Sequence, residues 1–306
     1  MRITLRLTGR QHGELRKHLY RGDGREAVSL ALCGRRVANG EQTLLVHQLV
    51  HVPLDQCAVR TPTRITWTTD LVGPLIEEAG SKGLALLKVH SHPGGFDRFS
   101  TCDDQADREL FESVFGWIDS DLCHGSAVML PDGRMFGRAA LPGMEFLPMA
   151  RIAVAGDDLR FWDAPSIPSS SLDDKAFFRN RQLFGEGTIR RLGALSIAVI
   201  GCSGTGSIVI EQLARLGAGH LLIVDFDHAE EKNLNRIVNS GREDATSGRL
   251  KVDIAERAIR WMGLGTTVEI LAEHLVHPDV IRRVASADVL FGCTDSVEAR
   301  HVLNPC

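Results

Sequence analysis

The pattern of apolar and polar residues differs between the two halves of the chain. In the first half, short alternating or apolar runs are mixed with runs of helical period. They predict strands at 26–32, 43–52 and 84–89, and helices at 71–80 and 104–115. This mixture predicts an α+β domain that is built on one central sheet.

In the second half, strand and helix patterns alternate regularly. The predicted order is strand 196–200, helix 207–216, strand 221–224, helix 250–261, strand 267–271, helix 278–285 and strand 289–291. Such alternation is typical of an α/β fold with a doubly wound, Rossmann-like parallel sheet. Four strands are fewer than the six of the classic sheet, so we expect a partial sheet, incomplete at its C-terminus.

A change in composition separates the two patterns. The run from Ala164 to Asp173 holds two prolines and four serines in ten residues, which favours neither helix nor strand. We therefore expect a first domain at 1–163, a linker at 164–173 and a second domain at 174–306.

The strand predicted at 84–89 leads into a group of residues able to bind a metal. His90 and His92 follow it and, at the strand period of two, lie on one face. Ser100 has the position of a helix N-cap, and Asp103 lies in the first turn of that helix. Two imidazoles and a carboxylate leave a fourth position on Zn²⁺ open for water. Taken singly, the histidines can simply face solvent, and Ser100 and Asp103 can simply cap the helix.

Taken together, the spacing His90-Ser91-His92-x7-Ser100-x2-Asp103 resembles the JAMM motif of the JAB/MPN zinc metalloproteases. That family also carries a glutamate at the start of an early strand. Glu26 matches it better than Glu14 or Glu41, because only Glu26 opens an apolar strand that ends in glycine.

The JAMM resemblance implies a deubiquitinase-like hydrolase. It implies that Zn²⁺ is held by His90, His92 and Asp103, that Glu26 is the general base, and that Ser100 donates a hydrogen bond to the oxyanion. Members of this family cleave peptide or isopeptide bonds at the C-terminus of ubiquitin or ubiquitin-like proteins.

The second half begins with a glycine-rich turn between a strand and a helix. Gly201, Gly204 and Gly206 form the turn, and Asp225 ends the next strand, nineteen residues after Gly206. Glycines let a backbone approach phosphates, and an acidic residue at this distance can bind a ribose. An NAD-dependent enzyme is one interpretation, although the spacing is GxxGxG and not GxGxxG.

The residues that follow favour a different nucleotide. Arg236 and Lys251 can stabilise phosphoryl charge, and Asp295 can hold Mg²⁺, although singly such cations are more often solvated. As an ordered set, from about Arg179 to the last residue, the sequence resembles the ThiF/MoeB adenylyltransferase family, which includes the ubiquitin-activating enzymes.

The ThiF resemblance implies that ATP binds over the glycine turn and reacts with the C-terminal carboxylate of a ubiquitin-like protein to give an acyl-adenylate. It assigns the contacts as follows: Asp225 to the ribose, Asn233, Arg236 and Lys251 to phosphates, and Asp295 to Mg²⁺. Arg181 would reach the ATP site of a partner subunit, which implies a homodimer through the second domain.

Together the two resemblances imply that one chain processes or removes a ubiquitin-like protein and activates its C-terminus. A bacterial ubiquitin-like conjugation system with an E2-like partner would contain such a fusion. Two alternatives stay open: processing and activation of a ThiS/MoaD-like sulfur carrier, and a binding module whose adenylation site is dead, the C-terminal domain being a fragment or degenerate.

Composition narrows the cellular setting. The 306 residues carry a net charge of −4, which argues against a nucleic-acid-binding protein. No apolar run has the length of a membrane span or of a signal peptide centre, so we expect no membrane partner. The seven cysteines are scattered, and none forms a CxxC pair, which predicts reduced thiols and a cytoplasmic location.

Overall fold

The computed structural model describes residues 2–38, 40–164 and 175–303. The chain divides into two compact units, Met1–Ile167 and Pro168–Cys306. Apart from Ala164, the predicted linker at 164–173 lies outside the described residues.

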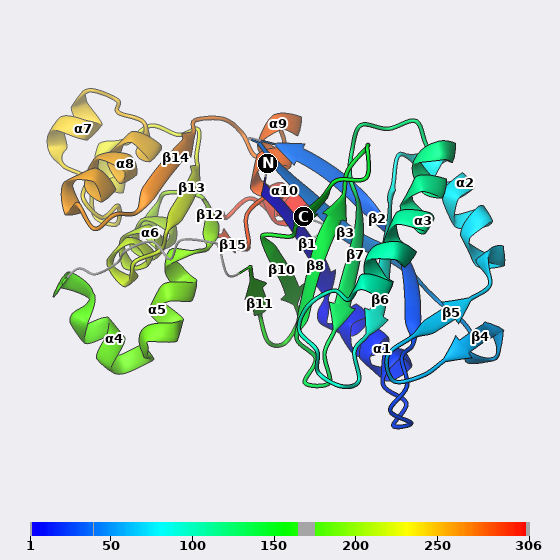
Figure 1. Ribbon diagram of the computed structural model, residues 1–306. Helices are drawn as coiled ribbons and strands as arrows, with labels where there is room; N and C mark the ends of the chain where they lie inside the picture. Colours follow the sequence, from blue (N-terminus) through cyan, green and yellow to red (C-terminus); the bar gives the residue numbers. More distant parts are fainter. Residues whose placement is uncertain (1, 39, 165–174, 304–306) are drawn as a thin grey trace. The chain divides into compact units, whose positions relative to one another are not determined.

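The first unit contains a nine-stranded mixed sheet in the order β11-β10-β1-β3-β2-β6-β7-β8-β9 (Figure 1). A separate hairpin pairs β4 with β5. The elements are β1 (Arg2–Thr8), α1 (Gly9–Leu19), β2 (Val28–Ala38), β3 (Glu41–His51), β4 (Cys57–Arg60), β5 (Ile65–Trp67), α2 (Val72–Lys82), β6 (Ala85–Ser91), α3 (Thr101–Trp117), β7 (His124–Met129), β8 (Met135–Ala140), β9 (Phe146–Pro148), β10 (Arg151–Ala155) and β11 (Arg160–Asp163).

Helices cover both faces of this sheet. Leu15 of α1 belongs to the same buried core as Leu87 of β6. Phe111 of α3 and Ile76 of α2 belong to a second core, with Leu86 of β6. Leu86 and Leu87 are neighbours on the strand and point to opposite faces, so the alternation of β6 decides which side chains face α2 and α3.

The second unit is a doubly wound parallel sheet in the order β14-β13-β12-β15. One core packs α6 and α8 on one face, and another packs α9 and α10 on the other. The elements are α4 (Phe178–Phe184), α5 (Glu186–Gly193), β12 (Ser196–Ile200), α6 (Gly204–Leu216), β13 (His220–Val224), α7 (Arg242–Thr246), α8 (Lys251–Met262), β14 (Thr267–Leu271), α9 (Pro278–Val284), β15 (Val289–Gly292) and α10 (Val297–Leu303). The predicted fold class is confirmed for both halves.

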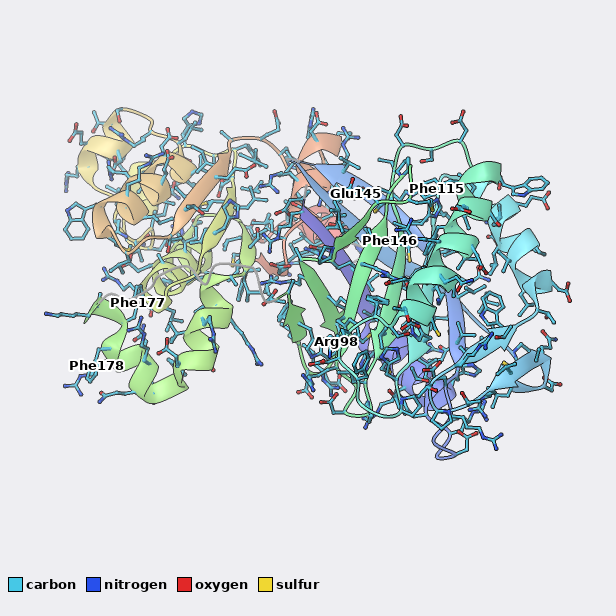
Figure 2. The ribbon with its side chains drawn as sticks, in the orientation of Figure 1. Arg98, Phe115, Glu145, Phe146, Phe177 and Phe178 are labelled. Carbon is cyan, nitrogen blue, oxygen red and sulfur yellow. The ribbon has the colours of Figure 1, made fainter. Side chains whose placement is uncertain are left out.

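Phe177 anchors the segment that precedes β12. Its ring is 1% exposed and packs against Gly217, the residue that ends α6, whereas Phe178 is 56% exposed (Figure 2). The amide of Asn180 also donates to the carbonyl oxygen of Arg215, at 3.1 Å. The start of α4 is therefore fixed at the C-terminal end of α6.

No helix among the described residues is long and apolar enough to cross a membrane.

Candidate functional site

Strand β6 carries His90 and leads directly into His92, and it lies between two other strands of the sheet. All seven of its residues are buried, and it pairs antiparallel with β2 and parallel with β7. Lys88 and His90 alternate with Leu87 and Val89, which face the α1 side of the sheet. The two polar residues therefore face α3.

A capping box brings Asp103 to the histidines. Ser100 is the N-cap of α3, and its Oγ accepts a hydrogen bond from the Asp103 amide at 3.2 Å. In return, the amide and hydroxyl of Ser100 each donate to Oδ2 of Asp103, both at 2.7 Å. The box therefore fixes the Asp103 carboxylate as well as the start of the helix.

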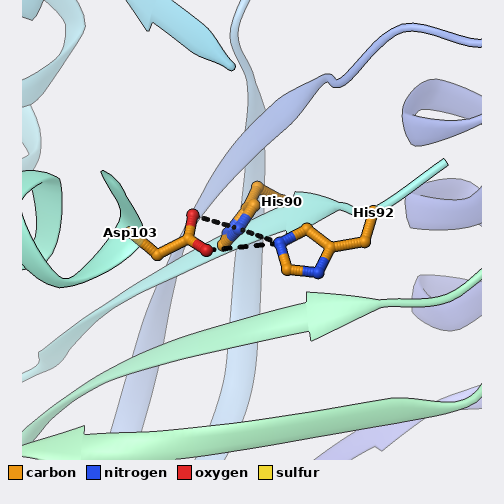
Figure 3. A group of neighbouring side chains, drawn as sticks. All are labelled: His90, His92 and Asp103. Atoms are coloured by element: carbon orange, nitrogen blue, oxygen red, sulfur yellow. Dashed lines mark hydrogen bonds and ion pairs between the residues drawn. The ribbon is translucent and has the colours of Figure 1, made fainter. Parts of the chain in front are cut away.

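The three predicted ligands converge (Figure 3). Nε2 of His90 lies 3.1 Å from Nε2 of His92 and 2.9 Å from Oδ1 of Asp103. Nε2 of His92 lies 3.3 Å from Oδ2 of Asp103. Although burial opposes it, hydrogen bonds from both imidazoles hold the pKa of Asp103 well below its usual range, so the cluster contains a carboxylate anion.

The donor set fits a divalent cation. Nδ1 of His92 lies 2.7 Å from the carbonyl oxygen of Phe96, which can only accept, so Nδ1 carries a proton and a metal ion could replace the proton on Nε2. This arrangement is typical of a metal-ligating imidazole. The three ligand atoms lie within 4.8 Å of one another, and two nitrogens with one carboxylate are ligands that Zn²⁺ accepts.

Glu26 lies beside this cluster, two residues before β2 and not within the strand as predicted. Its amide donates to Thr61 at 2.9 Å, and its carbonyl oxygen accepts from Nε of Arg60 at 2.8 Å. The residue is 5% exposed, and burial raises the pKa of its carboxyl to about 7. Glu14 instead pairs with His51, and Glu41 with Arg2.

Ser91 holds the Glu26 segment against β6, a role that the sequence did not reveal. The hydroxyl of Ser91 accepts a hydrogen bond from the amide of Ala27 at 2.9 Å, and its own amide donates to the Ala27 carbonyl oxygen at 3.1 Å. The residue between the two histidines therefore fixes the neighbour of Glu26.

A cleft of about 1460 Å³ opens onto the cluster, and we call it the α2–α3 cleft. Its polar end holds Glu26, Lys88, His90 and Asp103. Its walls come from α2, α3 and β5, and they carry apolar side chains that include Ile65, Trp67, Val72, Ile76 and Leu110. A large cleft with a few converging polar groups is the expected form of a substrate site.

We expect Ser100→Ala to destabilise the metal-free protein by about 1 kcal/mol, because it removes an N-cap. Denaturant unfolding measures this. Ser113→Ala is the matched control: that hydroxyl lies on the same helix, bonds only to the Glu109 carbonyl oxygen and is exposed. Equal losses for the two variants would contradict a capping role for Ser100.

In the second unit, the glycine turn is closely packed at two of its three positions. Gly201 has φ +96°, and a Cβ there would lie 2.6 Å from the carbonyl oxygen of Cys293. A Cβ on Gly206 would lie 1.7 Å from the carbonyl oxygen of Gly201. The turn therefore lies between the ends of β12 and β15, where the strand order reverses and ligands of such sheets bind.

Asp225 is held against this turn. Its Oδ2 accepts from the amide of Cys202 at 2.7 Å, and its Oδ1 accepts from the amide of Asp227 at 2.9 Å. Asp227, which was not singled out in the sequence, pairs with Nζ of the buried Lys251 at 2.6 Å. The carboxylate of Asp227 is half exposed, whereas Asp225 is 9% exposed.

Arg236 lies over the start of α6, where the nearest atom to a Cβ on Gly204 would be Cδ of Arg236 at 3.4 Å. Asn233 is buried, and its Oδ1 caps the amide of Glu230 at 3.1 Å. Asp295 is exposed in the loop after β15, one residue beyond Thr294, whose amide would lie 3.3 Å from a Cβ on Gly201.

Arg181 does not join this group. It follows Asn180, which contacts the C-terminal end of α6, and its Nε lies 3.4 Å from Glu186. The glycine turn is at the other end of that 13-residue helix, about 20 Å away along its axis.

The first unit thus has, at a strand end, a cluster of side chains able to hold a metal ion, and the second unit has a closely packed glycine turn between a strand and a helix. Residues 10–138 match the prokaryotic homologs of the JAB domain, and residues 177–306 match the ThiF family. The chain therefore joins a JAB domain to a ThiF-type domain.

Curated relatives and solved structures are similar to part of this chain. "Adenylyltransferase and sulfurtransferase MOCS3" of Sus scrofa is 31% identical over 146 residues, which cover 46% of this chain and 32% of that protein. "SAMP-activating enzyme E1" of Haloferax volcanii is 32% identical over 114 residues, which cover 37% and 42%. The chain thus spans less than half the length of either relative.

Among solved structures, E. coli tRNA N6-threonylcarbamoyladenosine dehydratase, TcdA, in complex with ATP, aligns with a TM-score of 0.41 and 26% identity. The alignment covers 45% of this chain and 56% of that chain.

Proposed function

We propose that the first unit is a zinc-dependent peptidase or isopeptidase that acts on the C-terminus of a ubiquitin-like protein, and that the second unit adenylates such a C-terminus. The observation that carries the first part is the convergence of His90, His92 and Asp103 beside the buried Glu26, at the polar end of the α2–α3 cleft.

His90, His92 and Asp103 would hold the zinc ion, which when bound supplies Lewis-acid activation of water. Glu26 takes the proton of the attacking water and passes it to the leaving amine. Burial supports this role, because it raises the pKa of Glu26, to about 7 in the metal-free protein, and so makes its carboxylate a stronger base. Ser100 can donate to the oxyanion only after its hydroxyl turns away from Asp103, to which it donates here at 2.7 Å.

In the second unit, the glycine turn would receive the phosphates of ATP at the N-terminus of α6. Arg236 lies over that turn, and Lys251 pairs with Asp227; both would contact phosphates, and Asp295 would hold Mg²⁺. We assign the ribose to Asp225 together with Asp227. Both oxygens of Asp225 already accept backbone hydrogen bonds, whereas the carboxylate of Asp227 is half exposed and can receive a further one. Asn233 orders the segment that carries Arg236.

We also propose a homodimer through the second unit. Arg181 lies about one helix length from the glycine turn of its own chain, so it can serve an ATP site only in a neighbouring subunit. An E2-like protein would accept the activated product. A ThiS/MoaD-like sulfur carrier is the alternative partner, and the C-terminal tail that the enzyme accepts decides between them.

The test is elemental analysis of zinc in the wild type and in His90→Ala/His92→Ala, alongside cleavage of C-terminal fusions of ubiquitin-like and sulfur-carrier proteins. We expect about one zinc ion per wild-type chain, and joint loss of zinc and cleavage in the variant. Folded wild-type protein that binds no zinc would contradict the peptidase assignment and favour a binding module.

A further inference from the structure

Three buried charged residues lie next to the metal-ligand cluster and have no part in the chemistry proposed above. Lys88 is 5% exposed, Asp107 is fully buried and Arg138 is 9% exposed. Lys88 lies on β6, the strand that carries His90; Asp107 lies on α3, the helix that carries Asp103; and Arg138 lies on β8.

Asp107 joins the other two. Its Oδ1 accepts from Nζ of Lys88 at 2.5 Å, and its Oδ2 accepts from Arg138, at 2.7 Å from one terminal nitrogen and 3.0 Å from Nε. The guanidinium of Arg138 is also held by the rings of Phe99 and Phe146, at 3.9 and 4.5 Å from their centroids. Phe146 is labelled in Figure 2. Arg138 pairs in addition with Asp104 at the surface.

The spacing of these contacts matches that of the metal ligands. Lys88 and His90 are two residues apart on β6, about 6.6 Å along the strand. Asp107 and Asp103 are four residues apart on α3, about 6 Å along the helix. The pairs Lys88–Asp107 and His90–Asp103 therefore join one strand face to one helix face at two successive levels.

Two levels of contact restrict α3 more than one can. Phe111 packs α3 against the sheet, but apolar packing and the single His90–Asp103 contact leave small rotations of the helix open, and these would change the orientation of the carboxylate. The second contact, one helical turn further along, opposes such rotations, and Arg138 fixes Asp107 from β8. Burial alone would raise the pKa of Asp107, but the charges of Lys88 and Arg138 outweigh it and hold that pKa below its usual range. Asp107 is therefore a carboxylate anion between two cations.

Stability alone is a weak reason for such a group. Buried ion pairs lose hydration on folding, and apolar residues of similar volume often replace them without loss. Here the ionic contacts are also directional, because Lys88 donates to one oxygen of Asp107 and Arg138 donates to the other, which defines how α3 sits on the strand.

We propose that Lys88, Asp107 and Arg138 are positioning residues of the metal centre, which set the distance of Asp103 from His90 and His92. The proposal rests on the proposed function, in that it treats the three ligands as a metal site. None of the three belongs to the converging group of ligand atoms, and they act through the placement of α3.

The test measures metal geometry and affinity in the full chain, independently of cleavage. Co²⁺ replaces Zn²⁺ as a probe, because its visible absorption depends on coordination geometry, and a chelator competition gives the Zn²⁺ dissociation constant. For Lys88→Met and for Asp107→Asn we expect a changed Co²⁺ spectrum and about tenfold weaker Zn²⁺ binding, the low end of the effect of residues that orient ligands. Lys88→Arg keeps the charge and should largely restore both.

Arg151→Met is the matched control. Arg151 is 3% exposed and pairs with Asp163 at 2.7 Å, but it lies on β10, four positions from β6 in the sheet. It should lower the melting temperature and leave the Co²⁺ spectrum unchanged. Wild-type spectra and affinities in Lys88→Met would overturn the positioning role, even if Asp107→Asn failed to fold. Wild-type protein that binds neither ion would overturn the metal centre itself, and the positioning role with it.

Discussion

Glu26→Gln is expected to bind zinc as the wild type does and to cleave a ubiquitin-like fusion about 10²- to 10⁴-fold more slowly, the usual contribution of a general base. The amide has nearly the shape of the carboxylate but cannot accept a proton from water. Zinc should stay because the three ligand atoms that converge belong to His90, His92 and Asp103. Elemental analysis and initial cleavage rates on one preparation measure both quantities.

Glu41→Gln is the control for this variant. It makes the same chemical change at an exposed residue that pairs with Arg2, and it should leave zinc content and rate unaltered. Loss of zinc from Glu26→Gln would instead identify Glu26 as a ligand, and an unaltered rate would show that another group takes the proton.

The pH dependence of the wild type follows from the same carboxyl. Glu26 acts as a base only when ionised, so the rate should fall as the pH drops through its pKa. Burial raises that pKa to about 7 in the metal-free protein, and a nearby divalent cation lowers it again. The acid limb of the profile therefore lies below pH 7, and the residual rate of Glu26→Gln should lack this limb.

The convergence of His90, His92 and Asp103 could be predicted from the sequence because local rules place these residues. The strand period put His90 and His92 on one face, and the N-cap spacing put Asp103 in the first turn of α3. All three lie within fourteen consecutive residues. Arg138 could not be found in this way, because it meets Asp107, 31 residues earlier, only through the pairing of β8 in the sheet. Lys88, a charged residue within an apolar strand, was the one visible sign of that cluster.

Helix α1 and the hairpin β4–β5 were missed for a different reason. The buried positions of α1 are His12, Leu15, His18 and Leu19, so half of its inward face is polar and its apolar period is weak. Strands of four and three residues, such as β4 and β5, are too short to show a period. These elements pair with each other or pack on the sheet through contacts that are distant in sequence.

In the second unit, Gly206→Ala is expected to destabilise the domain by about 3 kcal/mol, the upper part of the usual range for overpacking, and to abolish ATP–pyrophosphate exchange. The new Cβ would lie 1.7 Å from the carbonyl oxygen and 2.7 Å from the carbonyl carbon of Gly201. Both atoms are backbone, so the strand end or the helix start must move. That movement displaces the amides that would receive the phosphates.

Two glycine variants in the same unit separate this clash from a general effect of alanine. At Gly204 the nearest atom to a new Cβ is Cδ of Arg236 at 3.4 Å, the middle of a flexible side chain, so Gly204→Ala should keep wild-type stability. At Gly187, in α5, no atom lies within 4 Å of a new Cβ, so Gly187→Ala should keep both stability and exchange. Equal stability of the Gly206 and Gly204 variants would contradict the close packing of the turn. If the wild type shows no exchange while the stability difference persists, the close packing of the glycine turn holds and the adenylation proposed for the second unit is contradicted.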